Sequence, residues 1–167
     1  YTGGDARFQF LSTGVIDIPM LSNSEQCADM TMRLRAEYLF SRGRYSEIRF
    51  QDVNGNTLQY HGGSSRKALE KFLRKAYGVC STFSVSRETT PRPISEVQPG
   101  DVLVYPARKL EGMGHALIVI DVARNGNKVA IMCAEGNTPA RELHIVRNPN
   151  PISNPWFFFD GDESMLW

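Results

Sequence analysis

The sequence predicts an α+β fold in which an N-terminal helix that carries a cysteine packs on an antiparallel β-sheet. Two amphipathic segments typical of helices lie in the first half of the chain. Short apolar segments separated by turn residues fill the last third, as expected for strands. Helices followed by consecutive strands favour α+β over alternating βαβ units. The length of 167 residues fits one domain of ordinary size, and we expect residues 1–167 to form it.

The composition restricts the classes of function. Hydrophobic residues make up 41% of the chain and charged residues 22%, which is typical of a folded globular protein. The net charge of +1 gives no support to a nucleic-acid or membrane-surface partner. No apolar run approaches the roughly 18 residues of a membrane span. Four arginines should form a solvated face on and after the first helix, or else an anionic substrate groove: Arg33, Arg35, Arg42 and Arg44.

The first elements are an extended segment and a helix. Residues 7–19 hold two apolar stretches and should be extended, and the helix should run from about 24 to 41, capped by Ser or Asn and ended by Gly43. The side chains that we expect to face the core recur at three-to-four spacing: Cys27, Met30, Thr31, Leu34, Tyr38 and Ser41. In this register Cys27 is the first residue of the inward face.

The middle of the chain contains a hairpin and a second helix. Asn54-Gly55 lies between two β-prone segments, a strong hairpin pattern. A helix is predicted over 66–77, ended by Gly78, and a short extended piece over 82–85. The proline-rich stretch 89–99 reads as a surface connection.

The last third is predicted to supply the sheet. Strands are expected in four segments: 101–105, 116–123, 129–134 and 142–147. Asn125-Gly126-Asn127 turns the chain between the second and third of them. Residues 155–159 contain one tryptophan and three phenylalanines, which should cover the core.

Cys27 and His115 are the candidate catalytic pair. Cys27 lies at a predicted helix start, where the helix dipole favours thiolate over thiol. His115 lies just before a strongly apolar strand. Cysteine at a helix N-terminus and histidine at a strand start are one way to make a nucleophile. The alternative is a buried structural cysteine with an ordinary strand-edge histidine.

The order of these features resembles the NlpC type of bacterial cell-wall cysteine peptidases, within the papain-like superfamily. In that family a cysteine heads a helix, a Pro-Gly-Asp turn leads into one strand, and a histidine starts the next. Here the turn is Pro99-Gly100-Asp101, between Cys27 and His115. The resemblance implies a papain-like fold and a cysteine peptidase or amidase, with cell-wall peptides as the substrate by analogy.

A closer resemblance covers most of the chain. Gln26-Cys27-Ala28-Asp29, the segments 33–39 and 100–102, Gly114-His115-Ala116 with the strand that follows, and the segment 139–144 are similar to domain-of-unknown-function family 4846. That family consists of uncharacterised bacterial proteins that look exported, which implies a location in the periplasm or cell envelope. The resemblance begins near Gly14, which implies that an N-terminal part of the full-length protein lies outside this chain.

The NlpC resemblance also implies a third polar residue on the strand after the histidine strand. That strand here ends in Ala134-Glu135-Gly136-Asn137. Glu135 is the first choice to orient the imidazole, and Asn137 the second. Asp121 is six residues beyond His115, roughly 20 Å along a strand, and is therefore excluded.

The expected reaction follows from these assignments. The Cys27 thiolate attacks an amide carbonyl, and His115 protonates the leaving amine. The backbone N–H of Cys27 and the side chain of Gln26 are candidates to bind the oxyanion, and Asn137 to contact the substrate. This chemistry requires no cofactor and no metal.

Three other readings remain open, and one of them is a simple structural or adhesin-like function. NlpC-type enzymes usually carry Asp-Cys-Ser-Gly at the nucleophile, and the Gln26 and Ala28 departures favour a catalytically inactive papain-like module that binds a peptide or glycan. A metal site from Cys27, His115 and either Cys133 or His144 lacks paired ligand spacing. No phosphate-binding loop follows a strand.

The remaining cysteines and histidines have simpler expectations. The odd number of cysteines leaves at least one unpaired, and whether Cys80 and Cys133 form a disulfide stays open. His61 and His144 are expected at the surface. Asp29 is expected to be a partner of the helix dipole in the first turn.

Overall fold

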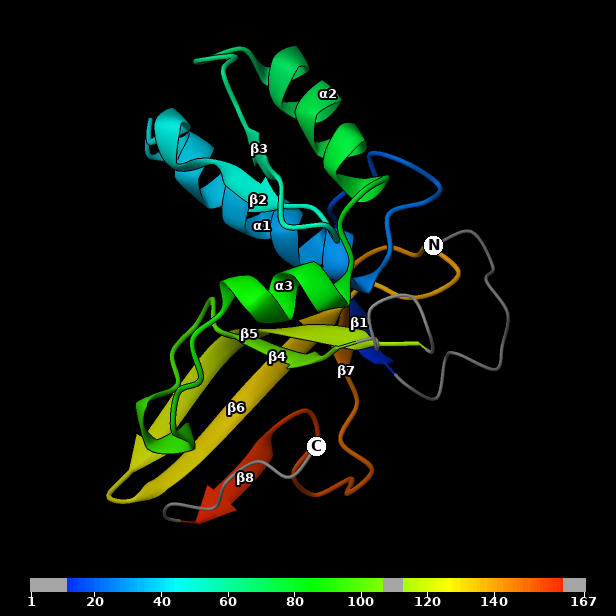
Figure 1. The fold of residues 1–167 in the computed structure, drawn as a ribbon. Helices are drawn as coiled ribbons and strands as arrows, with labels where there is room; N and C mark the ends of the chain where they lie inside the picture. Colours follow the sequence, from blue (N-terminus) through cyan, green and yellow to red (C-terminus); the bar gives the residue numbers. More distant parts are fainter. Residues whose placement is uncertain (1–11, 107–112, 161–167) are drawn as a thin grey trace.

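The computed structural model describes residues 12–106 and 113–160, which form a mixed α+β structure (Figure 1). Three α-helices occur in the order of the chain: α1 (Cys27–Ser41), α2 (Arg66–Tyr77) and α3 (Thr82–Glu88). Two 3-10 turns accompany them: η2 (Tyr45–Glu47) and η3 (Ile94–Glu96). The prediction of an α+β fold with a cysteine-bearing helix against an antiparallel sheet is confirmed at this level.

The main sheet has six antiparallel strands. Five follow the order β1-β7-β6-β5-β4, with these bounds: β1 (Ser12–Val15), β7 (His144–Val146), β6 (Lys128–Glu135), β5 (His115–Asn125) and β4 (Val102–Tyr105). The sixth strand, β8 (Phe157–Asp160), pairs with the first half of β6, whereas β7 pairs with its last two residues. The end of β6 is therefore enclosed by β5 and β7, and this is where Glu135 lies.

A small hairpin lies apart from the main sheet. Strands β2 (Arg49–Gln51) and β3 (Thr57–Gln59) are antiparallel partners. The turn between them includes Gly55, whose φ of 89° is readily reached only by glycine. The Asn54-Gly55 hairpin and the helix over 66–77 are thus confirmed.

Helix α1 begins at Cys27, three residues later than expected. Its N-cap is Gln26. The backbone N–H of Gln26 donates a hydrogen bond to the carboxylate of Asp29, at 2.9 Å. The predicted Ser or Asn cap is wrong, and the side chains of Ser22 and Ser24 bond to each other instead, at 2.7 Å. The shift makes Cys27 the first residue of the helix.

The inward face of α1 is only partly as predicted. Cys27, Met30 and Thr31 are buried, but Tyr38 is 54% exposed and Ser41 is also exposed. The prediction assumed one apolar face, which is the pattern of a helix that packs against a single partner. Helix α1 packs against the sheet on one side and against α2 and the hairpin on another, so buried residues lie on several of its faces.

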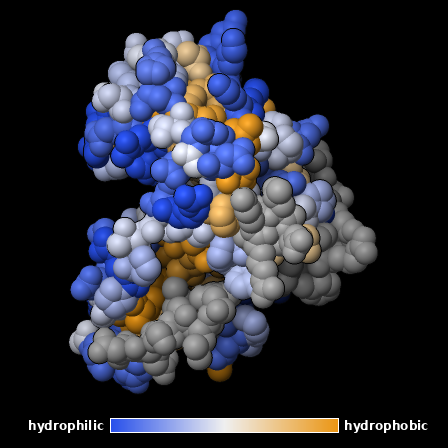
Figure 2. Space-filling model, in the orientation of Figure 1, coloured by the Kyte–Doolittle hydropathy of each residue, from blue (hydrophilic) through white to orange (hydrophobic). Residues whose placement is uncertain are grey.

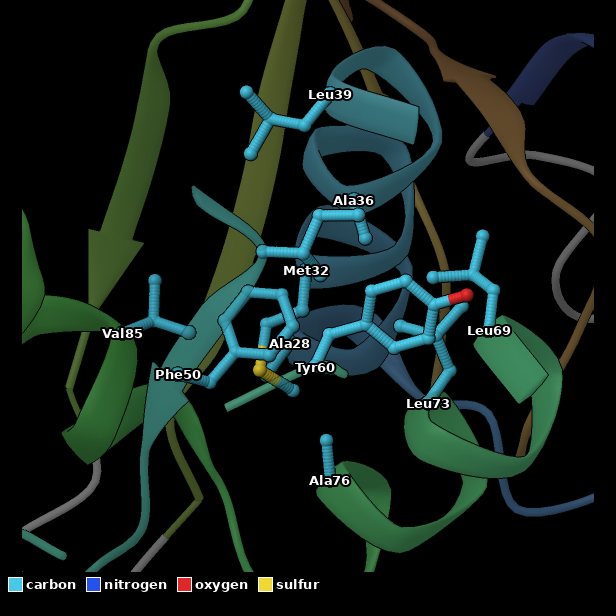
Figure 3. Close-up of a cluster of buried hydrophobic side chains, with 11 residues drawn as sticks. Ala28, Met32, Ala36, Leu39, Phe50, Tyr60, Leu69, Leu73, Ala76 and Val85 are labelled. Carbon is cyan, nitrogen blue, oxygen red and sulfur yellow. The ribbon is translucent and has the colours of Figure 1, made fainter. Parts of the chain in front are cut away.

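Two hydrophobic clusters flank α1. The larger one joins α1 to α2, the hairpin and α3, with the rings of Phe50 and Tyr60 between the helices (Figure 3). Its fully buried members include Leu69 and Leu73 of α2. The smaller one fixes α1 on the sheet through four buried side chains: Met30, Ile118, Ala134 and Leu143. The N-terminal half of α1 is therefore held from two sides.

A third cluster covers other strand residues. Ile94 and Val97, from and after η3, pack with alternate residues of β5 and β6: Leu117, Val119, Val129, Ile131 and Cys133. Phe157 and Phe159 of β8 pack against it, whereas Phe158 is exposed. The predicted core cover is thus confirmed for two of the three phenylalanines. Figure 2 shows apolar residues in a hollow over the sheet and hydrophilic residues over most of the helical part.

The segment 82–85 is helical, so the prediction of an extended piece is wrong. It forms most of α3, which starts with a capping box: Ser81 Oγ accepts from the Phe83 N–H, and Ser84 Oγ accepts from the Ser81 N–H. Buried Val85 then contacts the cluster around α1. Serine caps and tertiary burial outweigh the strand preference of Thr82, Phe83 and Val85.

Candidate active site

Cys27 lies at the first position of α1 and is 6% exposed. The first turn of the helix closes through a hydrogen bond from Met30 N–H to the Gln26 carbonyl, at 2.9 Å. The N–H groups at the start of an α-helix have no acceptor within the helix, and they carry the positive end of its dipole. The Cys27 thiol is therefore next to a region of partial positive charge.

His115 and Glu135 are placed together by the register of β5 and β6. Ile118 pairs with Ala134, which puts His115 and Glu135 at diagonal positions on adjacent strands. Their side chains hydrogen-bond, His115 Nε2 with Glu135 Oε2. The His115 side chain is 42% exposed, whereas that of Glu135 is 9% exposed. The carboxylate is thus on the buried side of the imidazole.

The three predicted catalytic residues lie together. Cys27 and His115 line the same pocket, and His115 bonds with Glu135. The Cys27 side chain is also the first cause of the raised pKa of His115. Because Nε2 is engaged by Glu135, Nδ1 is the ring nitrogen left for the thiol. This order of thiol, imidazole and carboxylate is the one expected of a nucleophile with an oriented base.

The electrostatics favour an imidazolium beside a carboxylate. The hydrogen bonds with Cys27 and Glu135 raise the pKa of His115 from 6.5 to about 10, against the opposing effect of burial. Burial acts to raise the pKa of Glu135, but the hydrogen bonds with His115 and His144 outweigh it and lower the pKa to about 2. At neutral pH Glu135 is therefore ionised and His115 protonated.

His144 is buried, so the expectation of a surface residue is wrong. It lies directly opposite Glu135 across β6 and β7, and its Nε2 is 3.2 Å from Glu135 Oε1. Its Nδ1 is 3.2 Å from the backbone carbonyl of Glu142. A histidine between Leu143 and Ile145 in an apolar strand was the pattern that could have revealed this. His61, in contrast, is exposed as predicted.

Gly136 allows the end of β6 to approach the start of α1. A Cβ at this position would lie 3.1 Å from the Gln26 carbonyl oxygen and 3.2 Å from the Cβ of Met30. Both contacts are tighter than ordinary van der Waals separation. The lack of a side chain at position 136 thus brings Glu135 close to the helix that carries Cys27.

The candidate pair lies at the wall of an open pocket of about 590 Å³. Cys27 and His115 line it, together with both residues that we assigned to substrate contact, Gln26 and Asn137. Polar side chains around the start of α1, the end of α2 and the start of α3 also line it: Ser24, Asp29, Tyr77, Ser81 and Thr82. The four residues predicted to act on or bind a substrate therefore share one cavity.

A buried ion pair supports the start of α1. Glu25 is fully buried and accepts hydrogen bonds from Leu21 N–H at 2.7 Å, Tyr77 Oη at 2.8 Å and Arg33 Nη1 at 3.1 Å. Arg33 is 4% exposed, so its assignment to a solvated face is wrong. The carboxylate of Glu25 explains why Arg33 can be buried, because a buried charge needs a partner of opposite charge.

Asp29 lies beside this pair. Burial raises the pKa of Asp29 to about 7, with Glu25 adding to the rise and the hydrogen bond from Gln26 opposing it. The charge of Asp29 is therefore only partial at neutral pH, and its main contact is the cap of α1. The prediction that Asp29 is a partner of the helix dipole is therefore incomplete, because this residue is buried and also caps α1.

The remaining candidates lie outside the site. Asp121 is exposed and follows a register shift in β5, and it is Glu135 that contacts His115. Cys80 and Cys133 are free thiols, as is Cys27, so the open question of a disulfide is answered. Within residues 12–106 and 113–160 no three His, Cys, Asp or Glu side chains are grouped to hold a metal ion. His115 and His144 bind different oxygens of Glu135 rather than one point.

The structure is a mixed α+β fold in which Cys27 and His115 line one pocket and Glu135 hydrogen-bonds with His115. The chain matches the family model described as a domain of unknown function (4846), over residues 1–62 and 61–166, and it belongs to this family. No curated protein and no solved structure matches it. Among the helices in the described part of the chain, none is long and apolar enough to cross a membrane.

Proposed function

We propose that the protein is a cysteine peptidase or amidase in which Cys27 is the nucleophile and His115 the general acid and base. The observation that carries the proposal is that Cys27 and His115 line one open pocket while the buried Glu135 carboxylate hydrogen-bonds with His115 from behind. A cysteine at the first position of a helix and an imidazole held by a carboxylate each favour the thiolate–imidazolium pair.

The reaction proceeds in two halves. The Cys27 thiolate attacks the carbonyl carbon of an amide, and the oxygen takes the negative charge at the N–H of Cys27, with Gln26 beside it. His115 gives its proton to the leaving amine, and the C–N bond breaks to leave a thioester. His115 then takes a proton from water, whose oxygen attacks the thioester, and the acid and the thiolate are released. Glu135 keeps the imidazole oriented in both halves.

The fold type and the substrate are further parts of the proposal. A cysteine helix against an antiparallel sheet, with histidine at the start of one strand and the third residue on the next, supports a papain-like fold of the NlpC type. The resemblance to NlpC-type enzymes supports peptides of the bacterial cell wall as substrates and a location in the envelope. The polar side chains among the lining residues offer hydrogen-bond partners to a peptide backbone.

A second candidate is an inactive module of the same fold that binds a peptide or glycan. The observation in its favour is the 6% exposure of Cys27, which leaves little of the thiol open to a substrate. Gln26 and Ala28, in place of the residues usual in NlpC-type enzymes, agree with it. A module of this kind uses the pocket without needing a reactive thiol.

The first experiment measures the rate of Cys27 alkylation by iodoacetamide between pH 5 and 10. The protein carries Cys80→Ser, which keeps the donor to the Gln51 carbonyl, and Cys133→Ala, which avoids a buried hydroxyl. His115→Ala is compared in the same background. We expect a rate at pH 6 at least about tenfold higher with His115 present, and equal rates above about pH 9, where a thiol ionises unaided.

Hydrolysis of peptidoglycan fragments, with Cys27→Ala as the control, then separates the two candidates. Release of new amino groups that depends on Cys27 supports the enzyme. A Cys27 that reacts equally with and without His115 contradicts it. Binding of the same fragments by that protein, measured by calorimetry, would support the module instead.

A further inference from the structure

His144 is the one histidine of the site that the proposed reaction does not use. It comes from β7, two strands away from His115, and reaches Glu135 from the other side. Its side chain is 9% exposed, as is that of Glu135. The order across the sheet is therefore His115, Glu135 and His144, with the carboxylate between two imidazoles.

Each oxygen of Glu135 has its own partner. Oε2 bonds with His115 Nε2, and Oε1 lies 3.2 Å from His144 Nε2. A carboxylate held at one oxygen still rotates about its last carbon–carbon bond, whereas one held at both has a fixed plane. The contact with His144 thus determines where Oε2 points, and Oε2 is the atom that meets His115.

The tautomer of His144 is set by its second contact. A backbone carbonyl only accepts hydrogen bonds, so the Nδ1 that faces the Glu142 carbonyl carries a hydrogen. That bond anchors the ring to its own strand and aims Nε2 across to β6. The contact of Nε2 with Glu135 Oε1 is a hydrogen bond when Nε2 carries a hydrogen as well, that is, in the imidazolium form of the ring.

We propose that His144 is a positioning residue, which holds Glu135 at Oε1 so that Oε2 orients the imidazole of His115. The functional consequence rests on the proposed reaction, because orienting His115 has an effect on rate only if His115 acts on Cys27. The positioning itself does not depend on that reaction. The lowered pKa of Glu135 agrees with this role, since the hydrogen bonds with His115 and His144 favour its charged form.

The test compares three variants of the full chain. His144→Phe fills the buried space without a donor, and His144→Gln keeps an N–H donor near the position of Nε2. His61→Phe is the matched control, because His61 is exposed. The readouts are the exchange of the His115 Nε2 proton with water at pH 7, and the acid titration of the Glu135 carboxyl carbon, both by NMR. His115→Ala and Glu135→Gln identify the two signals by their loss.

We expect the His115 Nε2 proton to exchange at least about tenfold faster in His144→Phe, as the bond to Glu135 loosens. The titration midpoint of Glu135 should rise in the same variant. His144→Gln should stay within about twofold of the native exchange rate, and His61→Phe should match the native protein. In a Glu135→Gln background, His144→Phe should change the exchange rate of the His115 Nε2 proton little further, because the residue that His144 positions is already altered.

Unchanged exchange and an unchanged Glu135 midpoint in a folded His144→Phe protein would overturn the proposal. Equal loss in His144→Phe and His144→Gln would also overturn it, since the ring rather than its donor would then matter. If the phenylalanine variant does not fold, His144→Asn replaces it in the comparison with His144→Gln. The asparagine side chain is shorter, so its donor does not reach Glu135. If the rate of Cys27 alkylation does not depend on His115 in any of these proteins, that result would contradict the proposed function but not the positioning of Glu135 by His144.

Discussion

His115 at the start of β5 and Glu135 at the end of β6 occupy diagonal positions on adjacent strands and hydrogen-bond through Nε2 and Oε2. The histidine is partly open to the pocket, while the glutamate lies behind it. The strand register thus sets the distance between the imidazole and the carboxylate. The predictions below follow from this arrangement and from the contacts that hold it in place.

Glu135→Gln should slow the alkylation of Cys27 at neutral pH. The amide keeps the size of the side chain but removes the charge that stabilises protonated His115, so the pKa of His115 falls from its value of about 10. We expect a decrease of about tenfold or more in alkylation rate at pH 6, and a larger loss in any hydrolysis. An alkylation profile identical to that of the native protein would show that Glu135 has no influence on the thiol.

The His115–Glu135 pair should contribute stability only within a limited pH window. Cys27 first and Glu135 second raise the pKa of His115 from 6.5 to about 10, so the contribution of protonated His115 is full below about pH 6.5 and is lost as the pH rises to 10. The pKa of Glu135 is lowered from 4.5 to about 2, so its contribution is full above pH 4.5 and is lost as the pH falls to 2. The pair is therefore most stabilising between about pH 4.5 and 6.5.

Urea unfolding of the native protein and of His115→Gln, at pH 5.5 and at pH 9.5, measures this window. The difference in free energy of unfolding between the two proteins should be larger at pH 5.5. A difference that stays constant, or grows toward pH 9.5, is the result that speaks against the pair.

Gly136→Ala should destabilise the protein and disturb the site. Its Cβ would lie 3.1 Å from the Gln26 carbonyl oxygen, so the end of β6 and the start of α1 must separate slightly. We expect a loss of about 1–3 kcal/mol in the free energy of unfolding, measured by urea denaturation, and slower alkylation of Cys27. Gly78→Ala is the control, since its Cβ would meet only the Lys75 carbonyl oxygen, at 3.6 Å. Equal stability of the two variants would contradict the close approach.

Arg33→Met should be strongly destabilising. The change leaves the carboxylate of Glu25, which is fully buried, without its cation. Breaking a buried ion pair in this way costs about 3–5 kcal/mol, measurable by urea denaturation. The double variant Glu25→Gln with Arg33→Met should recover part of the loss, because no unpaired buried charge remains.

The exposed pair of Arg44 and Glu47 provides the comparison for Arg33. Their side chains are about half exposed, and Arg44→Ala should change the stability little. A similar small effect in Arg33→Met would show that the buried pair is not formed in solution.

Several elements were predictable because their determinants are local. The helix over 66–77 follows from an apolar repeat with Ser65 before it and Gly78 after it, and the hairpin from Asn54-Gly55. The positions of Cys27 at a helix start and His115 at a strand start were also readable from neighbouring residues. Caps, turns and periodicity act over a few residues, so a single sequence contains them.

Other features were misread because local patterns competed with tertiary contacts. The segment 82–85 has β-prone side chains, but the caps at Ser81 and Ser84 and the burial of Val85 make it helical. Arg33 reads as one of several solvated arginines, and only the buried carboxylate of Glu25 accounts for its burial. The exposure of Tyr38 depends on which faces of α1 find partners.

The sequence by itself determined the α+β class, the helix that begins near Cys27 and the strand that begins at His115, and the resemblance to NlpC-type enzymes made Glu135 the first choice for a third residue. Tertiary structure alone decided that Glu135 lies between His115 and His144, and that Gly136 brings this group close to α1. The physical reason is strand pairing. Whether residues on β5, β6 and β7 touch depends on register and neighbour order, which long-range packing sets and no short stretch of sequence contains.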